Sequence, residues 1–96
     1  MSLEVQIEIT GNKGSFYIQV ENERLAESTF SVAGEHMIII DHTDVQDALR
    51  GKGAGNILIE YAVNWARKNN KMILPLCPFA NSVFQKTPEY ADVWKR

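Results

Sequence analysis

The chain has 96 residues and a mass of 10.9 kDa, which leaves room for one domain, residues 1–96, and excludes a second. Hydrophobic residues make up 45% of the sequence and charged residues 23%, as in an ordinary soluble globular protein. The formal net charge of -2 gives no overall field that would draw the protein to nucleic acid or to an anionic membrane. An anionic ligand would therefore have to be bound by a local site.

Cysteine content and the N-terminal sequence limit the compartment. The single cysteine excludes an internal disulfide and a zinc site built from several cysteines. The first residues lack the pattern of a signal peptide, and no apolar run approaches the ~20 residues that span a bilayer. We therefore expect a cytoplasmic protein with neither membrane nor nucleic-acid partners.

Strand patterns occupy the first 40 residues. Strands are predicted at residues 3–9, 16–20, 25–32 and 37–40. The first alternates apolar and polar residues, and the third places Ala26, Phe30 and Val32 on one face. Met37–Ile40 shows no alternation, which predicts a central strand covered on both faces. Short turns join the four strands, so we expect an antiparallel meander.

A strongly amphipathic helix follows, beginning at Gly53 or Asn56 and ending at Lys68. Its apolar stripe is formed by Leu58, Tyr61, Ala62 and Trp65. A fifth strand is predicted at 72–76, parallel to the fourth because a helix joins them through a right-handed crossover.

Two prolines organise the remainder of the chain. Pro75 donates no ladder hydrogen bond, so the fifth strand should be frayed or lie at an edge there. Pro78 suits the first position of a helix over 79–86, which makes Cys77 its N-cap, and a short helix is predicted at 89–94. The expected fold is α+β: a mixed, mostly antiparallel five-strand sheet with one main helix and a short helical tail.

The segment between the fourth strand and the main helix is basic and rich in glycine. Arg50–Gly55 has the form R-x-x-G-x-G and lacks the Gly-Lys-Ser/Thr ending of a P-loop. Strand, glycine turn and helix in this order present unpaired backbone N–H groups to an anion at the positive end of the helix dipole. This position favours a phosphorylated ligand.

On these residues the sequence resembles the GCN5-related N-acetyltransferase (GNAT) superfamily, and more closely its minimal YjdJ-like or NATD1-like branch. The matching blocks are 41–45, 49–55, 75–79 and 87–90. The resemblance implies an acetyl-CoA-dependent transferase that moves an acetyl group to an amine. The cofactor-binding residues that it implies are Val45, Arg50, Gly51, Lys52, Gly53, Ala54, Gly55 and Asn56. Arg50 and Lys52 would add charge to the backbone amides.

The sequence also departs from the wider superfamily. It ends at Arg96, before the positions of a sixth and a seventh strand, which normally complete the acceptor pocket and support a tyrosine near the thioester. The acceptor site would then be open, or a second subunit would complete it. Tyr90 is the nearest candidate for the tyrosine.

Cys77 and His42 are the candidate catalytic residues. An N-cap cysteine lies at the positive end of a helix, which favours the thiolate, and the resemblance puts the thioester at this strand end. His42 leaves the fourth strand at the same end of the sheet, so we expect the two to converge. His42 would act as base for a nucleophilic Cys77 that takes the acetyl group. Alternatively, the amine attacks the thioester directly, and Cys77 or His42 handles protons.

Other interpretations stay open. Cys77 can be a small buried hydrophobe, and His42 can be a hydrogen-bonding turn residue. Cys77, His42 and Asp41 have the right types for a metal site but no diagnostic spacing, so we expect no metal. Phe79 and Phe84 either flank the pantetheine arm or pack the last helix, and packing is the simpler interpretation.

The acceptor is expected to be an amine, on a small molecule or on a lysine of a protein or peptide. The protein could be a monomer or a homodimer. The competing function is a non-catalytic module that binds CoA or acetyl-CoA, or a protein partner, on the same scaffold.

Overall fold

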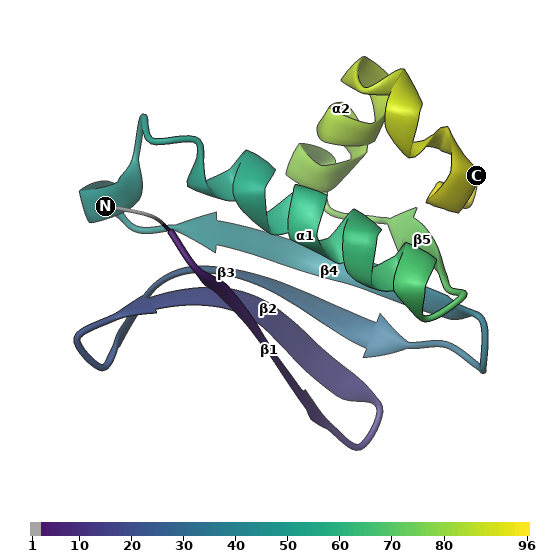
Figure 1. The fold of residues 1–96 in the computed structure, drawn as a ribbon, viewed down its shortest axis with the longest axis horizontal. Coiled ribbons are helices and arrows are strands. Elements are labelled where there is room, and N and C mark those ends of the chain that lie inside the picture. The colour runs from purple at the N-terminus through teal and green to yellow at the C-terminus, as the bar shows by residue number, and fades with distance from the viewer. Residues whose placement is uncertain (1–2) are drawn as a thin grey trace.

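The computed structural model of the protein describes residues 3–96 as a layer of strands under a layer of helices (Figure 1). The strands are Val5–Thr10 (β1), Lys13–Val20 (β2), Glu23–Val32 (β3), Met37–Val45 (β4) and Met72–Pro75 (β5). They form one sheet in the order β1-β2-β3-β4-β5, antiparallel from β1 to β4 and parallel between β4 and β5. The predicted α+β fold is therefore confirmed.

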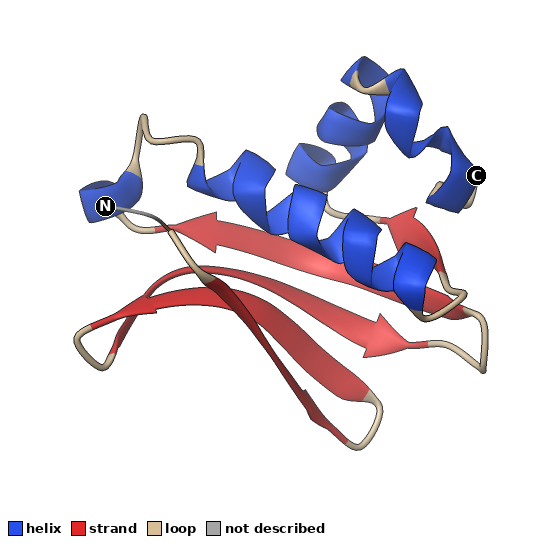
Figure 2. Cartoon of the chain, viewed as in Figure 1, coloured by secondary structure: helices blue, strands red, loops and turns tan. Residues whose placement is uncertain are grey.

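The helical segments lie on one side of the sheet (Figure 2). They are Asp47–Leu49 (η1, a 3-10 turn), Ala54–Lys68 (α1), Pro78–Lys86 (α2) and Pro88–Val93 (η2, also 3-10). The main helix and α2 lie close to their predicted bounds, and Cys77 is the N-cap of α2 as predicted. Within residues 3–96, every helix is too short or too polar to cross a membrane.

The core lies between α1 and the sheet. Leu58 and Ala62 are fully buried on the predicted stripe of α1, whereas Tyr61 and Trp65 are half-buried at its margin. Both aromatic rings meet Phe16 edge-on, with ring centroids 5.8 Å apart in each case. The stripe therefore packs against β2, as amphipathic periodicity predicts.

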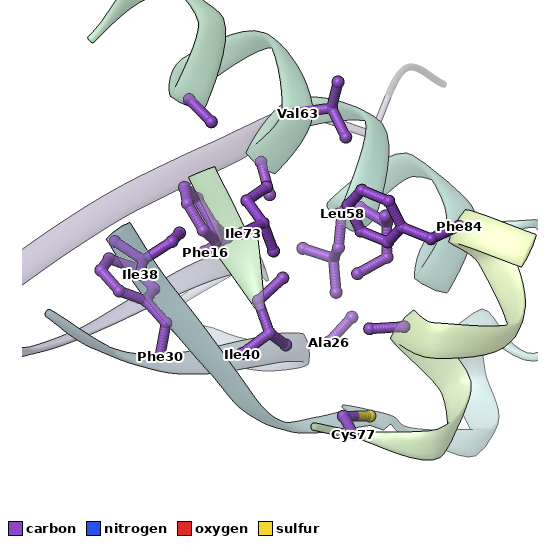
Figure 3. Packing of buried hydrophobic residues seen from close by; sticks show 14 of the residues in the cluster. Phe16, Ala26, Phe30, Ile38, Ile40, Leu58, Val63, Ile73, Cys77 and Phe84 are labelled. Carbon is purple, nitrogen blue, oxygen red and sulfur yellow. The ribbon is translucent and has the colours of Figure 1, made fainter. Parts of the chain in front are cut away.

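Two phenylalanines from neighbouring strands anchor this core (Figure 3). The rings of Phe16 and Phe30 stack with their centroids 4.7 Å apart, and both residues are completely buried. Gly14, the register partner of Phe30, leaves room for the ring: a Cβ built there would lie 2.3 Å from the Cζ of Phe30.

The prediction that β4 is covered on both faces is wrong. Ile38 and Ile40 are buried under α1, whereas Met37 and Ile39 are half-exposed on the other face. The run is apolar on both faces because Ile39 is paired with Leu74 of β5, so that neighbouring apolar side chains partly shield each other. We call the face that the helices leave uncovered the open face.

β4 is also longer than predicted, because it continues through five further residues to Val45. The register with β3 shifts between Thr29 and Phe30: Phe30 is paired with Ile40 and Thr29 with His42, so Asp41 is the extra residue of a β-bulge. Beyond the bulge, Thr43 turns its hydroxyl inward and lies 3.1 Å from the Oγ of buried Ser28. The polar residues predicted to leave the strand are thus part of it.

β5 forms one edge of the sheet, and Pro75 lies there as predicted. The outer side of this short strand is already engaged, because Lys95 donates its backbone N–H to the carbonyl of Ile73 at 2.8 Å. Pro75 has no N–H to offer, and its carbonyl accepts a hydrogen bond from the Asn81 amide at 3.4 Å. This edge is therefore blunted against pairing with another strand.

Candidate functional site

A surface pocket of about 220 Å³ opens where β4, η1 and the N-terminus of α1 meet. It is lined by Val45, Leu49, Arg50, Gly51, Gly53, Ala54, Gly55, Asn56 and Phe79. Seven of these nine are predicted cofactor-binding residues, and the structure brings them to one place. Lys52 is exposed and is not among the lining residues.

The pocket presents unused backbone donors. The first hydrogen bond of α1 runs from the N–H of Ile57 to the carbonyl of Gly53 at 3.0 Å. The N–H groups of Ala54, Gly55 and Asn56 consequently have no acceptor within the helix. Three donors at the positive end of a helix dipole form an anion site.

Glycine at the N-cap keeps these donors free. Gly53 has φ 73°, in the left-handed region, and no side chain of the described residues caps the helix. A serine or aspartate at this position would bind one of the amides itself. Gly51, with φ 77°, shapes the turn before it, so two predicted glycines hold the loop in a conformation that other residues rarely adopt.

Arg50 is the one cationic residue among the nine that line the pocket. Its Nη1 lies 3.1 Å from Oδ1 of Asp47, and 74% and 90% of the two side chains are exposed. An ion pair this exposed is weak, so the guanidinium can turn to a bound anion at little cost.

Phe79 is the lining residue that sequence reasoning assigned to packing. It projects from the first turn of α2, remains 40% exposed, and lies against Gly55 of α1. A Cβ on Gly55 would lie 2.6 Å from the Cζ of this ring. Nothing in the local sequence signals this contact between two helices.

β4 and β5 part close to this pocket. Their pairing ends at Ile40 and Pro75, and the carbonyl of Ile40 accepts hydrogen bonds from the N–H groups of Leu76 and Cys77, each at 3.1 Å. After this point β4 continues beside β3, whereas the chain beyond Cys77 turns into α2.

Cys77 lies at this parting, at one end of the hydrophobic core (Figure 3). It is 4% exposed, and its side chain makes no capping hydrogen bond in the part of the chain that the structure describes. Its position is the predicted one. Its thiol is packed away from water, however, so a reagent or substrate must enter the parting to reach it.

His42 does not converge with Cys77, and this expectation is corrected. His42 is paired with Thr29, whose side chain is on the open face, and it is exposed there. Cys77 continues the buried series of Ile73 and Pro75 on the helix side. The bulge at Asp41 is the physical reason, because it shifts the alternation of β4 by one residue.

Two further groups considered from the sequence, the possible metal ligands and Tyr90, are also not brought together with Cys77 at the pocket. Asp41 accepts a hydrogen bond from the Oγ of Ser31 at 2.9 Å on the open face, so Asp41, His42 and Cys77 are not grouped as metal ligands within residues 3–96. Tyr90 packs its ring edge-on against Phe84, with centroids 5.8 Å apart, and does not line the pocket. Burial, followed by the charges of Glu60 and Glu89, raises the pKa of Tyr90.

Residues 15–93 match a family model described as GCN5-related N-acetyl-transferase. The chain belongs to this family. The nine-residue pocket of this GCN5-related chain lies wholly inside the matched region.

Solved structures agree with this assignment. An NMR structure of a GCN5-like protein from Staphylococcus aureus is 41% identical to this chain, covers 94% of it and 87% of its own length, and superposes with a TM-score of 0.72. A ribosomal-protein-alanine N-acetyltransferase from Brucella melitensis biovar Abortus 2308 is 18% identical, with 78% of this chain and 60% of that chain covered and a TM-score of 0.64. An aminoglycoside N-acetyltransferase, AAC(6')-Iy in complex with CoA, is 12% identical, with 80% and 67% covered and a TM-score of 0.57. The last two are similar in fold. No curated protein matches the chain significantly.

Proposed function

We propose that this GCN5-related protein is an acetyl-CoA-dependent N-acetyltransferase of the minimal YjdJ-like or NATD1-like branch. The observation that carries the proposal is the pocket at the N-terminus of α1, where the amides of Ala54, Gly55 and Asn56 are free behind a left-handed Gly53. Such a cradle suits the pyrophosphate of coenzyme A. Arg50, in the same lining, would supply a positive charge to it.

The lining residues also suggest how the rest of the cofactor lies. Val45 and Leu49 form an apolar wall on the β4 side, and Phe79 forms one on the α2 side. β4 and β5 separate beyond Ile40, where Cys77 lies two residues before Phe79. A pantetheine arm running between these walls would bring the thioester to Cys77.

Acetyl-CoA supplies the activated acetyl group for two routes, which differ in the role of Cys77. In the covalent route its thiolate attacks the carbonyl carbon, the bond to the sulfur of coenzyme A breaks, and the acceptor amine later takes the acetyl group from Cys77. In the direct route the amine itself attacks, and Cys77 protonates the departing thiolate of coenzyme A. The burial of Cys77 favours the direct route, because a buried thiol is a poor nucleophile.

His42 is not placed to serve as the base for Cys77, so the proton-handling alternative is the role left to it. Since it is exposed on the open face, it is available to a group that approaches from there. The acceptor is a protonated amine at neutral pH and must lose a proton before it attacks. His42 lies on the face of β4 opposite to Cys77, so it can accept this proton only before the amine reaches the thioester.

The acceptor is an amine, either on a small molecule or on a protein or peptide. The similar structures include proteins named for a ribosomal-protein alanine and for aminoglycosides, both of which are amines. Acidic groups on the open face beside His42, namely Asp41 and Asp44, would attract such a cation. The protein would act as a monomer or a homodimer.

A non-catalytic module that binds CoA is the second candidate, and the 4% exposure of Cys77 favours it. Incubation with excess acetyl-CoA and a panel of amines, including lysine peptides, polyamines and aminoglycosides, separates the two. An acetylated amine that accumulates beyond one equivalent per protein supports the enzyme. Saturable CoA binding with no product from any acceptor would favour the module.

A further inference from the structure

Phe79 joins two parts of the candidate site that lie far apart in the sequence. Its ring touches the α1 backbone at Gly55, whose N–H is one of the three free donors. Of the described residues, Leu76, Phe79 and Ile9 are the exposed large hydrophobic ones, so two of these three flank Cys77. Phe79 keeps 40% of its surface in water although it contacts the helix.

The ring and the thiol both belong to the start of α2. Phe79 is two residues beyond Cys77, and Pro78 between them fixes its own φ. The carbonyl of Cys77 accepts the first hydrogen bond of α2, from the N–H of Asn81 at 2.9 Å. A Phe79 ring packed on Gly55 therefore holds the first turn of α2, and Cys77 with it, against α1.

We propose that Phe79 is a positioning residue that couples occupancy of the phosphate-binding amides to the burial of Cys77. The proposal rests on the proposed function, since it takes the pyrophosphate of coenzyme A as the anion. An anion on the amides fixes the N-terminus of α1, and the Phe79 ring then holds the first turn of α2 against it. Coupling of this kind is reciprocal, so a packed Phe79 also strengthens anion binding.

The single cysteine gives a direct readout that does not depend on catalysis. Because Cys77 is buried, iodoacetamide can alkylate it when the first turn of α2 opens, and the alkylation rate reports that opening. The probe ligand is 3′-phosphoadenosine 5′-diphosphate, which carries the pyrophosphate of coenzyme A but no pantetheine arm. Because this probe has no arm that could cover the thiol, any slowing of alkylation must come from a change in the protein.

We expect saturating probe to slow alkylation of the wild-type protein about fivefold or more, the lower end of typical coupling. In Phe79→Ala the probe should still bind, as measured by calorimetry, but the alkylation rate should no longer respond. Leu76→Ala is the matched control: it removes an exposed apolar side chain adjacent to Cys77 that does not line the pocket, and it should respond like the wild type.

A second pair of variants tests the contact itself. In Gly55→Ala the new Cβ must displace the Phe79 ring, so Cys77 should be alkylated about fivefold faster without any ligand. Alanine is the better helix former, so the same variant should not lower the midpoint of global unfolding. In the Phe79→Ala background, Gly55→Ala should leave the alkylation rate unchanged, because the ring is gone.

The outcomes distinguish failure of the coupling from failure of the cofactor site. If the probe binds the wild type but leaves alkylation unchanged, or slows Phe79→Ala equally, the coupling is wrong and the cofactor site stands. A faster rate for Gly55→Ala that persists in the Phe79→Ala background would also refute the role of the ring. If the probe does not bind the wild type, the proposed cofactor site fails, and the coupling fails with it.

Discussion

The backbone carbonyl of Ile40 receives the N–H of Cys77 at 3.1 Å, at the point where β4 and β5 separate. This bond fixes the N-cap of α2 to the buried strand of the sheet, so Cys77 keeps its place although its own side chain caps nothing within residues 3–96. The Cys77 thiol therefore lies at the point where the two strands separate, and its position depends on this hydrogen bond.

Cys77→Ala tests the chemistry at this parting. We expect coenzyme A to bind with unchanged affinity, because Cys77 does not line the phosphate-binding pocket, and acetyl transfer to fall by about 100-fold or more. Isothermal calorimetry and a product assay measure the two quantities. Intact-mass detection of acetylated Cys77 in the wild type would establish the covalent route, and transfer at the wild-type rate in the variant would exclude it.

Arg50→Ala should weaken coenzyme A binding about five- to tenfold, the contribution expected of one charge-assisted hydrogen bond. The dependence of the affinity on salt should fall as well, since fewer charges are engaged. Asp47→Asn is the matched variant: it releases Arg50 from its 3.1 Å ion pair and should leave binding equal or slightly tighter. Equal affinities for Arg50→Ala and the wild type would remove Arg50 from the site.

Gly14→Ala tests the packing of the core. The new Cβ would lie 2.3 Å from the Cζ of Phe30 and 2.9 Å from the carbonyl oxygen of Glu8, and the Phe30 ring is fully buried. We expect a loss of about 1–3 kcal/mol in the free energy of unfolding, measured by chemical denaturation. In a Phe30→Leu background the additional cost of Gly14→Ala should shrink. An equal cost in both backgrounds would show that the ring is not what excludes the methyl group.

Asp92 contributes stability at neutral pH that is lost in acid. Hydrogen bonds from Arg67, at 2.8 and 2.9 Å, tie the last turn of α1 to η2 and hold the pKa of the Asp92 carboxyl below its ordinary 3.8. A carboxyl whose pKa is lower in the folded state stabilises the protein above about pH 4, and this contribution is lost as the pH falls further. Asp92→Asn should therefore reduce stability at neutral pH slightly, because the pair is half-exposed, and converge with the wild type near pH 2. A constant difference across this range would contradict the assignment.

The sequence predicts the meander, the main helix and the glycine loop because each has a local signal. The alternation of β1 and β3, the stripe from Leu58 to Trp65 and the spacing of Arg50 to Gly55 are all determined over a few residues. The bulge at Asp41 has no such signal. Asp41 and His42 are both polar and both on the open face, whereas Thr43 is polar and faces inward, so the alternation is hidden.

The errors at the site have the same origin. His42 is displaced from Cys77 by one inserted residue, which no local pattern announces. The contribution of Phe79 depends on its contact with Gly55, in a different helix. Local periodicity predicts which helix or strand a residue belongs to. It does not predict which residues of two different helices touch, because that depends on how the helices pack.

Calorimetric titration of Gly53→Val with CoA and with acetyl-CoA shows whether Gly53 and the free amides behind it bind coenzyme A. Gly34→Val is the matched control, because Gly34 has φ 79° against 73° for Gly53, has the same open space at its Cβ position, and lies outside the pocket. Both variants should lose similar stability from a valine at positive φ. We predict saturable binding of both ligands to the wild type and to Gly34→Val, and a dissociation constant raised about 100-fold or more, ~2.7 kcal/mol, for Gly53→Val. No binding by the wild type, or equal binding by all three proteins, would contradict the account.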